Sequence, residues 1–128
     1  MNKCLLIVDD DDSIRSLLNQ ELTDAGYIIE EAKNGKEALA IQRRQPADVL
    51  LTDIFMPEMD GYEVIQKFKE QFPTVAVIAM TGGMPRKPDG PYLEIAQKFG
   101  AKWILPKPFS SLQFGEIIRA ATGEQPAA

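Results

Sequence analysis

Short, continuous apolar runs constrain the fold of this chain more than any other feature of the sequence. The run at 49–51 has strand length, reaches Asp53 within two residues, and is followed by a loop that contains Pro57 and an Asp-Gly pair at 60–61. An apolar run without polar alternation is typical of a strand buried on both faces. Asp53 is therefore predicted at the C-terminal end of a buried strand, where open α/β sheets carry their chemistry.

A single aspartate at a strand end is a weak indication of function, because Asp commonly closes a turn or caps the next helix. The sequence repeats the arrangement, however. A first apolar run at 4–8 ends on four acids, Asp9 to Asp12, and two later strand ends carry Thr81 and Lys107. Chemically capable side chains at several strand ends favour one shared site over several unrelated turns.

Five predicted strands alternate with five predicted helices along the chain. Helices are indicated by the spacing of apolar residues and by the positions of Gly, Pro and capping residues. This alternation requires a doubly wound α/β fold, a parallel sheet with right-handed crossovers and helices on both faces. The second strand is more polar and is expected at an edge. The strands are predicted at 3–8, 27–32, 49–53, 75–80 and 103–105, and the helices at about 11–25, 34–45, 62–72, 91–100 and 110–121.

Capping residues predict where several of these helices begin. Asn34 followed by Glu37, and Ser110 followed by Gln113, have the spacing of a capping box. One of the acids at 11–12 is expected to cap the first helix, so part of the acidic run has a structural explanation.

Composition excludes several classes of function. The 128 residues suffice for one domain, and a net charge of −5 with a pI of about 4.7 leaves no basic surface for nucleic acid. Without any histidine the chain has no Ser-His or Cys-His nucleophile, and its single cysteine, Cys4, is expected in the core. The run at 4–8 is too short for a signal peptide or membrane span, so we expect a cytoplasmic protein without membrane or nucleic-acid partners.

Carboxylates at the first and third strand ends are expected to meet. These strands commonly lie side by side where the winding of a doubly wound sheet reverses, so Asp9, Asp10 and Asp53 would share one crevice. Two carboxylates about 4 Å apart repel by roughly 4 kcal/mol at an effective dielectric constant near 20, so a divalent cation is their natural partner. An all-oxygen ligand set without histidine or cysteine points to Mg²⁺.

The other polar strand ends add groups that bind phosphate. Thr81 offers a hydroxyl and Lys107 an ammonium, and both can hold phosphoryl oxygens. With Mg²⁺ they fit phosphoryl transfer, in which the metal and positioned cations carry most of the catalysis. Asp53 ends its strand alone and is the better nucleophile, whereas Asp9 and Asp10 form a pair suited to metal binding. An acyl phosphate on Asp53 would result.

Together these motifs resemble the receiver domain of two-component response regulators. The resemblance implies a flavodoxin-like (βα)5 fold with strand order 2-1-3-4-5, a receiver domain over residues 1–121 and a disordered tail at 122–128. The motifs that carry it are Ile7-Val8-Asp9-Asp10, Asp53-Ile54-Phe55-Met56-Pro57, Met59-Asp60-Gly61, Thr81-Gly82 and Lys107-Pro108-Phe109.

The resemblance also implies a role for each site residue. Asp53 would receive a phosphoryl group from a phosphohistidine of a sensor kinase or a histidine phosphotransfer protein. Asp10, Asp53 and the backbone carbonyl of Phe55 would bind Mg²⁺, and Asp9 would act mainly through a metal-bound water. The groups that hold the phosphoryl oxygens would be Thr81 and Lys107.

A protein of this kind is not a turnover enzyme. It catalyses only its own aspartyl phosphorylation and dephosphorylation, and it signals through a conformational change to a separate downstream protein. Phosphorylation adds about −1.5 to −2 charges at the site, which is enough to draw in Thr81 and Lys107. A monomer or weak dimer is expected.

Two features depart from the family's usual pattern. Receivers commonly have Tyr or Phe three residues before the lysine, where this chain has Ile104, and the neighbouring Trp103 should face the opposite way. The segment between Thr81 and Gly100 is also a few residues longer than usual, with three prolines and three glycines at 82–91. We expect this loop, rather than an aromatic switch, to carry much of the phosphorylation signal.

Two alternative functions fit parts of the pattern. An aspartyl-phosphate enzyme of the haloacid dehalogenase type would need a second Asp two residues after the nucleophile, where Phe55 stands. A degenerate receiver that binds partners without being phosphorylated would be consistent with Ile104. The intact acidic pair, acceptor, threonine and lysine favour the phosphoacceptor over both.

Overall fold

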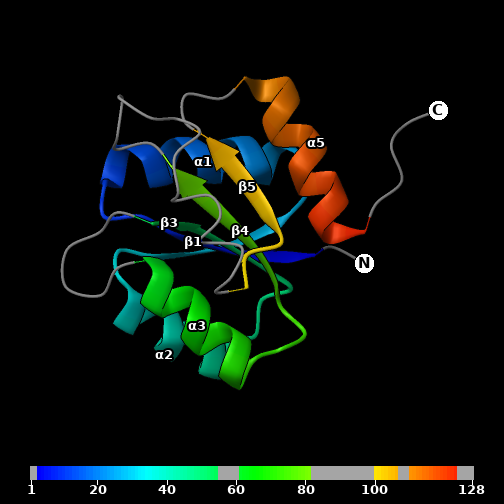
Figure 1. Cartoon of the computed structure of the whole chain (residues 1–128). Helices are drawn as coiled ribbons and strands as arrows, with labels where there is room; N and C mark the ends of the chain where they lie inside the picture. Colours follow the sequence, from blue (N-terminus) through cyan, green and yellow to red (C-terminus); the bar gives the residue numbers. More distant parts are fainter. Residues whose placement is uncertain (1–2, 55–60, 82–99, 107–109, 124–128) are drawn as a thin grey trace.

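Five parallel strands form a single sheet in the order β2-β1-β3-β4-β5, which confirms the predicted fold class and strand order (Figure 1). The structure is a computed structural model that describes residues 3–54, 61–81, 100–106 and 110–123. Each pair of neighbouring strands is parallel. The strands are β1 (Cys4–Val8), β2 (Ile28–Ala32), β3 (Val49–Asp53), β4 (Ala76–Thr81) and β5 (Trp103–Pro106).

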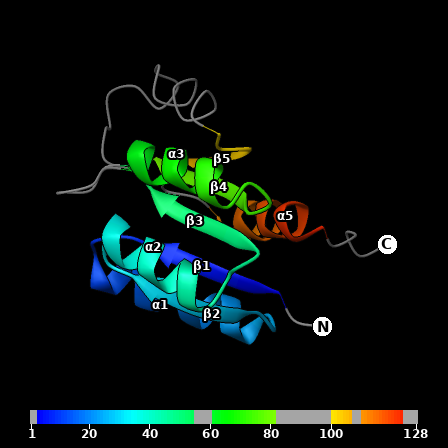
Figure 2. The same cartoon turned by 90° about the horizontal axis from the view of Figure 1, so that it is seen from below.

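Helices cover both faces of the sheet, α1 and α5 on one face and α2 and α3 on the other, as Figures 1 and 2 show. The described helices are α1 (Asp12–Asp24), α2 (Gly35–Arg44), α3 (Gly61–Gln71) and α5 (Ser111–Thr122). The helix predicted at 91–100 falls almost wholly outside the described residues. None of the helices in the described ranges is long and apolar enough to cross a membrane.

Strand alternation divides the core into two clusters, one for each face of the sheet. Leu5 and Ile7 of β1 pack with the apolar residues of α1 and α5, such as Leu22 and Phe114. Leu6, on the same strand, packs with the apolar residues of α2 and α3. All five residues of β1 and all five of β3 are buried. The prediction that their apolar runs are strands buried on both faces is therefore confirmed.

The polar strand β2 lies at an edge of the sheet, as its composition predicted. It begins at Ile28 rather than at the predicted Tyr27. The backbone N–H of Tyr27 donates to the carbonyl of Leu22 at 3.1 Å, so this residue closes α1 instead of joining the sheet. The end of α1 therefore uses the N–H of Tyr27, which a strand beginning at Tyr27 would have needed for the sheet.

The predicted caps are present, with one difference. Asp11 accepts hydrogen bonds from the N–H groups of Ser13 and Ile14, so the second acid of the pair at 11–12 is free to begin α1. Ser110 and Gln113 form a complete capping box on α5. Asn34 caps α2, but the carboxylate of Glu37 accepts from the N–H of Lys33, one residue before the donor that a capping box uses.

Candidate metal centre

Three aspartates meet where the chain leaves β1 and β3. The two strands are hydrogen-bonded neighbours, and their register pairs Val8 with Thr52, so Asp9 and Asp53 leave the sheet at the same edge. Carboxylate oxygens of Asp9, Asp10 and Asp53 all lie within 4.8 Å of one another. The prediction that these three residues share one crevice is borne out by this geometry.

The three aspartates differ in exposure. The residues Asp9 and Asp53 are buried, at 1% and 8% exposure, whereas Asp10 is exposed. The cluster therefore has two carboxylates set into the protein and one at its mouth. An ion could enter past the exposed carboxylate and lose part of its hydration to the buried pair.

Asp9 is fixed by contacts from three directions. Its N–H donates to the carbonyl of Ala32 on β2 at 3.2 Å, which extends the β1–β2 ladder by one residue. Its carboxylate Oδ1 accepts the N–H of Asp11 at 2.9 Å. Its own carbonyl accepts a hydrogen bond from Nη1 of Arg15. Local backbone structure thus determines where this carboxylate points.

Asp53 is fixed through the sheet. It is the last residue of β3, opposite Met80 of β4, and the following N–H, of Ile54, donates to the carbonyl of Met80 at 3.1 Å. The hydroxyl of Thr52 donates to the carbonyl of Asp53 at 3.0 Å. Ile54 is fully buried. The backbone that carries the Asp53 carboxylate is therefore held on both sides.

The donor set fits a hard divalent cation. All the candidate ligand atoms are carboxylate oxygens, which Mg²⁺ and Ca²⁺ prefer, and a small set with one open side suits Mg²⁺, which keeps several of its waters. Asp10 makes no side-chain hydrogen bond within the part of the chain that the structure describes. Its oxygens are therefore available to an ion without the loss of an existing contact.

Two further predicted site residues belong to neighbouring strands. Thr81 is the last residue of β4 and is paired with Pro106, the last residue of β5. The backbone of Thr81 is thus at the same edge of the sheet as Asp53, one position further along the adjacent strand. Phe55 and Lys107 lie outside the described residues, so their predicted roles stay predictions.

Ile104 and Trp103 face opposite sides of the sheet, as alternation predicted. Ile104 packs against the cluster formed with α2 and α3, and Trp103 packs against the cluster formed with α1 and α5. The ring of Trp103 also lies 5.3 Å from the ammonium of Lys102. The ring of Trp103 therefore does not occupy the place that an aromatic side chain at position 104 would occupy.

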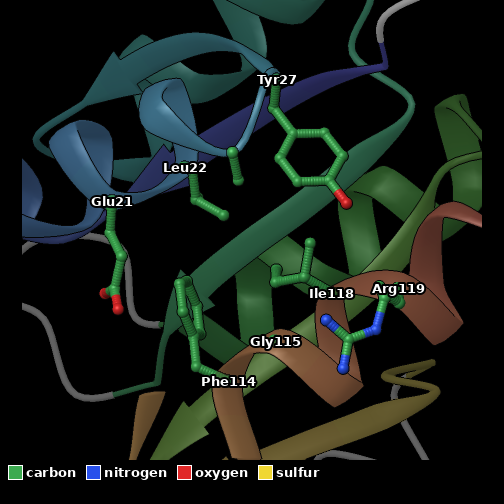
Figure 3. A pocket seen from close by; sticks show the side chains of 8 residues that line it. Glu21, Leu22, Tyr27, Phe114, Gly115, Ile118 and Arg119 are labelled. Atoms are coloured by element: carbon green, nitrogen blue, oxygen red, sulfur yellow. The ribbon is translucent and has the colours of Figure 1, made fainter. Parts of the chain in front are cut away.

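A second hollow, of about 200 Å³, lies between α1 and α5 and was missed by sequence reasoning (Figure 3). Figure 3 shows the side chains of Leu22 and Tyr27 on one side of it and those of Phe114, Ile118 and Arg119 on the other. Its α1 residues come from the last turns of that helix, whereas the acidic cluster precedes the first turn. Residues about 90 positions apart make it, so no local pattern could have indicated it.

A doubly wound sheet with carboxylates gathered at the carboxyl ends of two adjacent strands defines a class of α/β domains that bind ions and phosphate groups at a topological switch point. Within that class the chain has a specific match. The family described as the response regulator receiver domain matches residues 5–119, and the chain belongs to this family.

Relatives of different lengths share this domain. The chain is 36% identical over 117 residues to an uncharacterised 14.6 kDa protein from the sodA1 3′ region of Leptolyngbya boryana, which covers 90% of this chain and 86% of the relative. It is 39% identical over 103 residues to the DNA-binding transcriptional regulator NtrC of Proteus hauseri, covering 80% of this chain. The match spans only 21% of NtrC.

Solved structures confirm the fold. The chemotaxis protein CheY4 of Vibrio cholerae superposes with a TM-score of 0.84 at 28% identity, covering 94% of this chain and 99% of that one. The shared fold and the acidic cluster together identify a receiver domain, which is typically a signalling module rather than a turnover enzyme.

Proposed function

We propose that this protein is the phosphoacceptor of a two-component system and that Asp53 accepts the phosphoryl group. The donor is a phosphohistidine on a sensor kinase or a histidine phosphotransfer protein. One observation carries the proposal: the carboxylate of Asp53 lies within 4.8 Å of those of Asp9 and Asp10, at the edge of the sheet where a receiver binds phosphate.

Each residue has a separate task in this proposal. Asp10, Asp53 and the backbone carbonyl of Phe55 would hold Mg²⁺, and Asp9 would act on it mainly through a bound water. When bound, Mg²⁺ offsets the negative charge of the carboxylates and of the incoming phosphoryl oxygens. The groups that take the remaining phosphoryl oxygens are the hydroxyl of Thr81 and the ammonium of Lys107.

The chemical step is a displacement at phosphorus. A carboxylate oxygen of Asp53 attacks the phosphorus atom as the P–N bond of the phosphohistidine breaks. The imidazole leaves with the electron pair of that bond and gains a proton from solvent. An acyl phosphate forms on Asp53, and its later hydrolysis returns the carboxylate and inorganic phosphate.

Phosphorylation then changes a surface that a separate protein reads. The new charge draws Thr81 and Lys107 toward Asp53. Thr81 is the last residue of β4, Lys107 follows β5 in the sequence, and α5 packs against these two strands. Ile104 stands where receivers usually have an aromatic residue, so we assign much of the readout to the loop at 82–91. Amide hydrogen exchange with and without a phosphoryl mimic tests this assignment. If the exchange rates of other segments change while those of the loop at 82–91 do not, the assignment is wrong.

The phosphoacceptor proposal is tested first by intact mass. We expect one phosphoryl adduct after incubation with Mg²⁺ and a small acyl-phosphate donor. The adduct should be absent from an Asp53→Asn variant and from a sample with EDTA. A matched control is Asp24→Asn, which neutralises an exposed aspartate at the other end of α1 and should leave the adduct unchanged.

The alternative is a degenerate receiver that acts by binding alone. If neither the small donor nor a phosphorylated kinase gives an adduct, while the protein remains folded, the phosphoacceptor proposal fails. Binding of the same partner by wild type and Asp53→Asn would then support the alternative. Ile104 is the sequence feature that keeps this second function in consideration.

A further inference from the structure

The acidic cluster lies beside a cation that the proposed chemistry does not use. Arg15 is the fourth residue of α1, and only 12% of its side chain is exposed. A positive charge near a helix N-terminus opposes the helix dipole, so helix preference does not account for its position. Its tertiary contacts must account for it.

The guanidinium of Arg15 contacts three groups at once. Nη1 donates to the backbone carbonyl of Asp9, and Nη2 donates to the carboxylate of Asp12. Nε lies 3.3 Å from Oε1 of Glu31 on β2, an ion pair without the alignment of a hydrogen bond. Asn19 in turn donates to the other oxygen of Glu31 at 2.6 Å. The planar fork is thus oriented by residues of both α1 and β2.

One of these contacts acts on the metal site directly. The carbonyl of Asp9 and the N–H of Asp10 belong to the same planar peptide unit. A hydrogen bond that fixes this carbonyl fixes the plane of the unit and hence the direction in which the Asp10 side chain leaves the backbone. Asp10 makes no side-chain hydrogen bond within the described ranges, so its carboxylate is directed through its backbone. The Arg15 contact fixes the peptide unit before Asp10, and the hydrogen bond from the N–H of Asp11 to Asp9 fixes the one after it.

We infer that Arg15 is a positioning residue for the metal site. It holds the Asp9–Asp10 peptide so that the carboxylate of Asp10 faces that of Asp53 before the cation arrives. The inference rests on the proposed function, because it assigns Mg²⁺ to the same three carboxylates. Arg15 itself touches neither the ion nor the phosphoryl group.

Charge and geometry predict opposite results when Arg15 is changed. If the residue mattered only as a charge, Arg15→Gln would make the cluster more negative and tighten Mg²⁺ binding, and Arg15→Lys would change little. If the residue matters through the geometry of its hydrogen bonds, Arg15→Lys should also weaken Mg²⁺ binding, because an ammonium cannot reproduce the planar, multidentate geometry of guanidinium. The pair of variants therefore separates the two roles.

The experiment is calorimetric titration of Mg²⁺ into the whole protein, together with urea unfolding in the absence of Mg²⁺. We expect the dissociation constant to rise about tenfold in both Arg15→Gln and Arg15→Lys, the lower end of the loss that follows removal of groups orienting metal ligands. Arg44→Gln removes the same charge from an exposed site on α2 and should match wild type. Glu31→Gln leaves Arg15 in place and removes one of its three contacts, so it should weaken binding less than the two Arg15 variants do.

Each outcome decides between the inference and its rivals. Unchanged Mg²⁺ affinity in folded Arg15→Gln and Arg15→Lys, with only the urea midpoint lowered, would show a structural role and overturn the inference. Tighter binding in Arg15→Gln alone would overturn it in favour of a charge effect. If Arg15→Gln does not fold, Arg15→Lys and Glu31→Gln decide. Wild type that binds no Mg²⁺ refutes the proposed function instead, so the two failures are distinguishable.

Discussion

At the scale of single residues, the same side chain serves different purposes in three adjacent settings. Asp9 is buried, and its carboxylate accepts a hydrogen bond from a neighbouring N–H. Asp10 is exposed, and within the described residues its carboxylate is positioned by the backbone rather than by a side-chain hydrogen bond. Asp11, one residue later, is a helix cap. Sequence reasoning could assign one of these acids to the helix and two to the ion, but the contact from Arg15 is invisible without the structure.

Cys4 offers a pH-dependent test of burial. Burial raises the pKa of the Cys4 thiol, and the nearby carboxylates of Glu30 and Asp48 raise it further. A raised folded-state pKa means that the stability contributed is complete below the unfolded pKa, about 8.5, and is lost as pH rises through the folded value. We expect wild type to lose stability more steeply than Cys4→Ala in urea unfolding between about pH 8 and pH 10.

Alkylation provides the independent check on Cys4. The thiol should resist iodoacetamide in the native protein at neutral pH and react once urea unfolds the chain. Parallel pH profiles for wild type and Cys4→Ala, or rapid alkylation of the native protein, would contradict the assignment of Cys4 to the core.

At the scale of elements, the connection from α2 to β3 depends on one buried amide. Gln42, in the last turn of α2, accepts from the N–H of Ala47 at 2.9 Å and donates to the carbonyl of the same residue at 3.2 Å. Gln42 and Ala47 are both buried. The side chain thus replaces the strand partner that this backbone would otherwise need, two residues before β3 begins.

We expect Gln42→Met, which keeps the side-chain volume, to lower the free energy of unfolding by about 2–6 kcal/mol, because two buried backbone groups lose their partners at about 1–3 kcal/mol each. Urea unfolding measures the difference. Gln66→Met, at an exposed position of α3, is the matched control and should stay within about 0.5 kcal/mol of wild type. A loss no larger than that of the control would show that the loop finds other partners.

Element order and most caps followed from the sequence because each depends on local periodicity or on a single residue type, whereas the strand order followed from the resemblance to receiver domains. Boundaries failed where two elements compete for one donor, as at Tyr27. The hollow between α1 and α5 and the contacts of Arg15 could not be predicted, because they join residues that only the tertiary fold brings together. The convergence of the three aspartates was predictable because parallel strands end at a common edge.

At the scale of the whole molecule, the site should cost stability until an ion is bound. Three carboxylates within 4.8 Å repel one another, and at that distance each pair contributes about 1 kcal/mol even with the full screening of water. Asp10→Asn removes one charge from the exposed side of the cluster. Asp10 takes part in two of the three pairs, so in EDTA the variant should be more stable than wild type by about 2 kcal/mol.

Mg²⁺ should reverse that order. At a hundred times the dissociation constant, a ligand that binds only the folded state stabilises it by about 2.7 kcal/mol. Wild type gains this amount and Asp10→Asn gains less, so their unfolding curves should exchange positions as Mg²⁺ is added. Equal Mg²⁺-induced shifts in the two proteins would place the ion elsewhere.

The buried strands β1 and β3 have a consequence for how such a chain can diverge. The two buried aspartates are attached to the strands that both cores enclose, so they inherit the rigidity of the interior rather than the variability of the surface. Residues on the outer faces of the helices can then differ between proteins of this fold without moving the buried carboxylates. The same acidic site is therefore compatible with many different binding partners, because the strands carry the site and the helices form the surface that a partner contacts.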